Sequence, residues 1–126
     1  MNLLPPQECF KIEPLELLDK LKSDMMFPIP PNVNSRENRL IAAQTITKAT
    51  AYESYCAEME TRAKLLKKAA KAAKQTEEYN RMMSYEDIFK TLKEISKQHI
   101  ENVAKLMTLK RLELDEQRQN YNKQIT

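Results

Sequence analysis

Apolar residues recur every three or four positions along the second half of the chain, which is the spacing of one face of an α-helix. This stripe runs through Tyr85, Ile88, Leu92, Ile95, His99, Val103, Leu106 and Leu109. No segment alternates apolar and polar residues in the manner of a half-buried β-strand. The pattern predicts an all-α protein.

Proline and glycine divide the chain sharply in two. All 6 prolines lie in the first 31 residues, and residues 32–126 contain neither proline nor glycine. These two residue types are the strongest helix breakers. We therefore expect a proline-containing arm over residues 1–31 and a helical body over residues 32–126.

The arm is expected to hold one short amphipathic helix over about residues 13–26, because Pro14 suits the first turn of a helix. Leu15, Leu18 and Met25 are assigned to its apolar face, and Phe27 follows directly after the helix. These four residues are candidate partner-docking residues. They could dock onto the hairpin of their own chain or onto another protein, and their spacing does not choose between the two.

The body is expected to form two helices, over about residues 35–82 and 84–120. Asn34 or Ser35 can cap the first helix. Ser84 is followed by Glu86 and Asp87, an arrangement typical of a fresh helix start, so we place the break near residues 80–84. Two long helices joined by a short link fold back as an antiparallel hairpin, which we favour over one continuous helix.

A hairpin of two helices covers each helix on one side only, so it cannot enclose a core. We expect such a chain to associate with itself or with protein partners, and the arm to tether it to a neighbour.

The composition removes several function classes. Glycine is absent, so there is no glycine-rich phosphate loop, dinucleotide-binding fingerprint or G-x-S-x-G nucleophile motif. The 2 cysteines are far apart in sequence and indicate free thiols rather than a disulfide framework. No secretory signal and no apolar run of about 18 residues is present, so we expect no membrane association. The expected location is intracellular, either soluble or within a particle assembled in the cytoplasm.

Residues that could carry catalysis are few. The single histidine, His99, lies on the apolar stripe, and Cys56 is the one conceivable nucleophile on the facing helix. Packing at the edge of the core is the better interpretation of His99. Neither the Glu-x-x-His of a di-iron bundle nor the ligand set of a structural zinc site occurs. We therefore expect no enzyme activity, no cofactor, no metal and no small-molecule substrate.

One basic segment stands out from an otherwise balanced chain of net charge +3. Between residues 62 and 74 there are basic side chains and no acidic ones; the basic residues are Arg62, Lys64, Lys67, Lys68, Lys71 and Lys74. Their helical spacing could place ammonium groups along a nucleic-acid backbone. It is also the pattern of a solvated helix face, and no aromatic residue is present for base stacking.

The leading hypothesis is a non-enzymatic structural or adaptor subunit of a larger assembly, with the hairpin as a strut and the arm as a tether. The first alternative is a small nucleic-acid-binding accessory protein that uses the basic face. The second is a small helical inhibitor or regulator of another protein. Glycine-free, lysine-rich helical chains of this kind include coiled-coil adaptors and viral or phage components, and composition does not distinguish among them.

Overall fold

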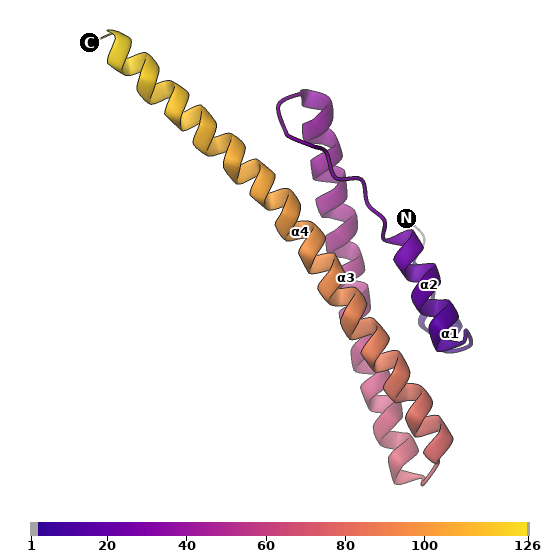
Figure 1. Ribbon diagram of the computed structural model, residues 1–126. Coiled ribbons are helices and arrows are strands. Elements are labelled where there is room, and N and C mark those ends of the chain that lie inside the picture. The colour runs from indigo at the N-terminus through magenta and orange to yellow at the C-terminus, as the bar shows by residue number, and fades with distance from the viewer. Residues whose placement is uncertain (1–2, 126) are drawn as a thin grey trace.

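A computed structural model describes residues 3–125, and these residues form four helices and no strand. The helices are α1 (Pro6–Cys9), α2 (Pro14–Asp24), α3 (Arg36–Ala72) and α4 (Thr76–Ile125). The long helices α3 and α4 pack against each other as an antiparallel hairpin, and the arm with α1 and α2 precedes them (Figure 1). The predicted all-α fold is confirmed. The arm differs from the expectation in carrying the extra turn α1, and its main helix is shorter than residues 13–26.

The start of α3 is set by Ser35, whose Oγ accepts a hydrogen bond from the backbone N–H of Asn38 at 3.0 Å. A serine in this position satisfies one of the backbone donors that a helix leaves unpaired in its first turn.

The break between the long helices was predicted near residues 80–84, and that position is wrong. The chain turns at Ala73–Gln75, where Lys74 adopts a left-handed conformation with φ of 57°. The N–H of Gln75 donates to the carbonyl of Ala70 at 2.9 Å, and the N–H of Lys74 donates to the carbonyl of Lys71 at 3.1 Å. This pair of bonds is the Schellman ending of a helix, with lysine in the place where glycine is usual.

Ser84 lies inside α4 instead of capping a new helix. Its Oγ donates a hydrogen bond to the carbonyl of Asn80, which is four residues earlier, at 3.2 Å. A serine side chain can form hydrogen bonds to the backbone within a helix as well as at its start. The presence of a serine therefore does not by itself mark where a helix begins. The second long helix consequently begins at Thr76, and it continues to Ile125 rather than ending near residue 120.

The hairpin packs through two rows of residues with the alternating three- and four-residue spacing of a coiled coil. The buried row on α3 is Ala42, Thr45, Ala49, Tyr52, Cys56, Met59, Ala63 and Ala70. The buried row on α4 is Met82, Tyr85, Phe89, Leu92, Ser96 and Val103. Every seventh residue of α3, from Ala42 to Ala70, is alanine or cysteine, and such small side chains allow the two backbones to approach closely.

The arm closes the core that the two helices leave open. Leu17, Leu21 and Met25 are at most 2% exposed and belong to the same apolar cluster as Tyr55 and Phe89. The arm is therefore a third structural element lying along the hairpin (Figure 1). The sequence predicted a two-helix body without a closed core. The chain instead forms a core that the arm helps to close.

Candidate functional site

The arm is held to the hairpin by side chains that bond to its backbone. Because much of the arm is irregular, its carbonyl groups lack helical partners. Tyr55 donates a hydrogen bond to the carbonyl of Leu4 at 2.8 Å, and Thr45 donates one to the carbonyl of Pro28 at 2.6 Å. Such bonds fix the path of the arm across α3.

Helix α4 holds the arm in the same way. The hydroxyl group of Tyr85 donates to the carbonyls of Phe10 and Ile12, and Arg81 Nη2 donates to Phe10 at 3.1 Å. The rings of Phe10 and Tyr85 also pack edge to face, with centroids 5.1 Å apart. The arm thus bonds to both long helices of its own chain.

This packing buries some of the candidate docking residues of the arm and leaves others exposed. Met25 is 1% exposed and Phe27 is 9% exposed, so both belong to the core of the chain. Leu18 is half-buried, whereas Leu15 is 75% exposed. The apolar face of α2 is therefore made by Leu17, Leu21 and Met25, and the assignment of Leu15 to it was wrong. Of the four candidates, Leu15 alone remains open to a partner.

The basic segment is partly neutralised by the hairpin itself. Arg62 pairs with Glu58 at 3.0 Å and Lys64 pairs with Glu60 at 3.5 Å, both within α3. Lys67 reaches across to Glu86 on α4 at 2.7 Å, and this contact raises the pKa of the lysine. Half of the predicted basic face therefore has acidic neighbours.

The other half of that face is exposed. Lys68, Lys71 and Lys74 make no ion pair within residues 3–125. These three lysines lie near the turn between the long helices, over little more than one and a half helical turns. So short a row of unpaired charge favours a solvated surface over a track for a nucleic-acid backbone.

Cys56 and His99 do not combine into a reactive pair. Cys56 is fully buried in the hairpin, and burial raises the pKa of its thiol to about 12. Since the thiolate is the nucleophilic form, this thiol is unreactive near neutral pH. The ring of His99 packs edge to face on Phe27 at 5.5 Å, as expected for a residue at the edge of the core.

Within residues 3–125 no three His, Cys, Asp or Glu side chains gather closely enough to hold a metal ion. Nor does any helix of this part combine the length and the apolar character required to cross a bilayer.

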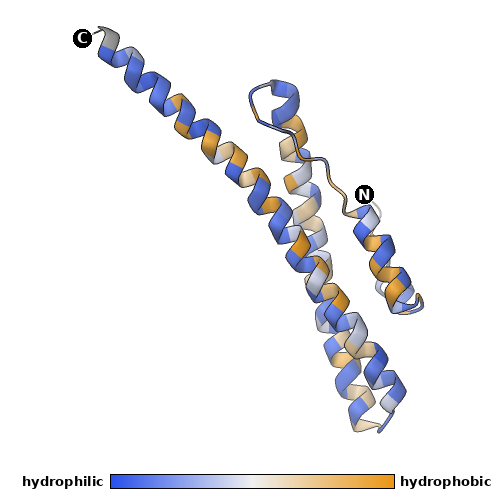
Figure 2. Ribbon diagram, viewed as in Figure 1, coloured by the Kyte–Doolittle hydropathy of each residue, from blue (hydrophilic) through white to orange (hydrophobic). Residues whose placement is uncertain are grey.

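The most distinctive surface is the end of α4. Beyond Leu106, the last residue of α4 that packs against the hairpin, α4 continues without a neighbour in the view of Figure 1. We call residues 104–125 the α4 extension. Every residue from 111 to 123 is exposed. Large apolar side chains are exposed there too, namely Met107, Leu109, Leu112, Leu114 and Tyr121. Figure 2 shows hydrophobic and hydrophilic residues alternating along this part of α4.

The sequence shows why the hairpin ends where it does. The row that packs α4 on α3 would continue after Leu106 at Lys110, Glu113 and Gln117, all of which are polar. The apolar residues of the extension lie on other sides of the helix, and they cannot be covered by prolonging the same seam. The sequence did not reveal this surface, because the apolar residues up to Leu109 were interpreted as one continuous helical stripe.

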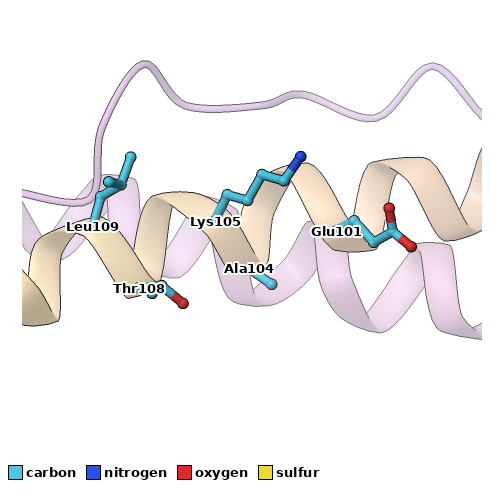
Figure 3. A pocket seen from close by; sticks show the side chains of 5 residues that line it. All are labelled: Glu101, Ala104, Lys105, Thr108 and Leu109. Carbon is cyan, nitrogen blue, oxygen red and sulfur yellow. The ribbon is translucent and has the colours of Figure 1, made fainter.

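A shallow hollow of about 460 Å³ lies at the base of the extension, lined by Glu101, Ala104, Lys105, Thr108 and Leu109. Figure 3 shows the side chains of Lys105 and Leu109 extending from the same side of α4. All five lining residues come from this one helix, so the hollow is a feature of an open helix surface. It lacks the enclosing walls of a small-molecule site.

Comparison with known proteins gives no relative: no protein-family model, no curated sequence and no solved structure matches this chain.

Proposed function

We propose that this chain is a non-enzymatic structural or adaptor subunit of a larger protein assembly, and that the α4 extension makes the contact. The observation that carries the proposal is the continuation of α4 past the hairpin with five large apolar side chains exposed. Large apolar side chains that are exposed together on one segment are typical of sites of protein interaction.

The energetics of helices in proteins support the same role. Most of the stability of a helix in a protein comes from packing of its apolar side chains. The hairpin packs against α4 as far as Leu106, and the large apolar side chains beyond that residue are exposed. A protein partner would supply packing for these side chains and would gain a preformed docking element in return.

The arm takes a different part in this proposal from the tether expected from the sequence. Its apolar residues are occupied by the hairpin, so it builds the body that presents the extension. The hairpin keeps the role of a strut.

Truncation after Leu106 tests the proposal. We expect the shortened chain to keep the melting temperature of the hairpin and to lose the complexes that the full chain forms in the cells that produce it. Cross-linking followed by mass spectrometry measures those complexes. Leu65→Gln is the matched control, because Leu65 is 61% exposed but lies on α3, away from the extension.

The proposal fails if the truncated chain retains the same cross-linked partners as the full chain. It also fails if Leu65→Gln removes those partners as completely as the truncation does, since the contact would then lie on the hairpin.

A further inference from the structure

Four residues of the α4 extension form a short self-complementary face. Lys105, Leu109, Leu112 and Glu116 are separated by four, three and four positions, which places them on one side of a helix. Leu109 is 62% exposed and Leu112 is 55% exposed, and both charged residues are also exposed. We call these four residues the Lys105–Glu116 face.

The order of residues on this face makes it complementary to a second copy of itself that runs in the opposite direction. Read forwards it is basic, apolar, apolar, acidic, and read backwards it is acidic, apolar, apolar, basic. A second copy running in the opposite direction would therefore place its Glu116 opposite Lys105, and its Leu112 opposite Leu109. A two-fold axis repeats each pair, as an interface between identical surfaces requires.

Neither charge of the face has an ion-pair partner among residues 3–125. Lys105 follows Glu101 by four residues, yet the two form no ion pair within 4.0 Å in the described chain. Glu116 has no basic residue three or four positions away on either side. Nearby charges behave differently, since Lys97 pairs with Glu94 and Lys110 pairs with Glu113.

We propose that two copies of this chain associate through their Lys105–Glu116 faces as an antiparallel pair of helices. The inference rests on the proposed function, and it names a second copy of the chain as one partner of the extension. Charge complementarity selects this occupant, because the face supplies both halves of each ion pair. The small side chains of Ala104 and Thr108 leave the hollow beside Leu109, where Leu112 of the second copy would pack.

The arrangement does not bring the two bodies together. Its axis passes between residues 110 and 111, so the hairpin of each copy lies at the opposite end of the paired segment. Two layers of leucine bury little surface, and the flanking ion pairs are exposed. We therefore expect a weak dimer that dissociates as salt is raised.

Charge reversal in the full-length chain tests the pairing by sedimentation equilibrium at low salt. We expect Lys105→Glu alone and Glu116→Lys alone each to lower the association constant by about tenfold or more, because like charges then face each other twice. Mixed in equal amounts, these two variants should associate again, since every pair between them is once more opposite in charge. The double variant K105E/E116K should dimerise as the unmodified chain does.

The matched control is Arg111→Glu, which makes the same change in charge as Lys105→Glu on another side of the extension. It should leave association unchanged. A monomeric unmodified chain, a mixture that fails to recover, or a control that dissociates equally would each overturn the inference. So would binding of a different protein to this face on a chain that stays monomeric.

The failure of this inference can be separated from the failure of the proposed function. If the charge variants leave self-association unaffected while truncation after Leu106 still removes partner proteins, the pairing is wrong and the adaptor role stands. If the truncation removes nothing, the adaptor role itself is wrong.

Discussion

Tyr55 on α3 and Tyr85 on α4 both hold the arm, because the hydroxyl group of each donates to backbone carbonyls of the arm. Both rings are buried, so each residue adds apolar packing to the core and also satisfies polar groups that the irregular arm leaves unpaired. The attachment of the arm thus depends on a few hydroxyl groups as well as on its leucines.

Replacing Tyr85 by phenylalanine should lower the free energy of unfolding by about 1–3 kcal/mol, because the carbonyls of Phe10 and Ile12 lose a buried donor. Urea denaturation measures the change. Tyr121→Phe is the control, since Tyr121 is 64% exposed and should give a change close to zero. Equal midpoints for the unmodified chain and Tyr85→Phe would show that these bonds contribute nothing.

Lys74 is the residue at which the chain accepts an unfavourable backbone conformation. Its φ of 57° costs a lysine about 1 kcal/mol or more relative to the usual helical region, and glycine avoids this cost. We expect Lys74→Gly to raise the free energy of unfolding by up to about 1 kcal/mol, as measured by thermal or urea denaturation.

The matched control for that prediction is Lys68→Gly, which lies within α3 and should destabilise the chain by about 0.5–1 kcal/mol. The two substitutions should therefore have opposite signs. A loss of stability in both would mean that the turn is not strained at Lys74.

At the scale of the elements, the helix α2 shows what a single amphipathic pattern leaves undecided. The leucines at positions 15, 17, 18 and 21 are close enough together to make two overlapping apolar faces. Contact with the hairpin selects the face of Leu17 and Leu21 and leaves Leu15 exposed. Hydrophobic spacing predicted that the helix exists, but only its neighbours determine which side it buries.

This selection predicts unequal effects for two neighbouring leucines. Leu17→Ala should cost about 2–5 kcal/mol, because Leu17 is fully buried and its loss leaves a cavity. Leu15→Ala should change stability by no more than about 0.5 kcal/mol, as is usual for an exposed site. Urea denaturation of both variants measures the difference, and equal losses would mean that α2 does not pack as described.

The boundaries of the elements were predictable to different degrees. The change from arm to body follows from the prolines, and the cap at Ser35 follows from its residue type. The turn at Lys74 carries no such signal, because the chain has no glycine to mark a left-handed residue. The end of the hairpin near Leu106 was readable from the polar residues that follow in the same row, whereas the docking of the arm depends on contacts distant in sequence.

At the scale of the whole molecule, the positive charge is distributed in a way that weakens the nucleic-acid alternative. Arg62, Lys64 and Lys67 have acidic neighbours, and the three unpaired lysines lie together near one end of the hairpin. The net charge of +3 adds little long-range attraction.

We therefore expect no binding to a DNA duplex even at low salt, where electrostatic attraction is strongest. Fluorescence anisotropy with a labelled duplex measures this. Steep, salt-dependent binding would contradict the expectation, and replacement of Lys64, Lys67, Lys68 and Lys71 by glutamine would then locate it. Loss of that binding in the glutamine variant would restore the nucleic-acid hypothesis, because glutamine keeps the helix propensity of the face.

The passage of α4 from the hairpin into the extension has a mechanical consequence. Helices bend sharply at proline, at glycine or where their hydrogen bonding is interrupted, and residues 76–125 contain neither proline nor glycine. The extension therefore has no hinge at its base and behaves as a stiff spacer of about 30 Å, at 1.5 Å for each residue. If a partner binds near the far end as proposed, the length of α4 would set its distance and angle from the hairpin.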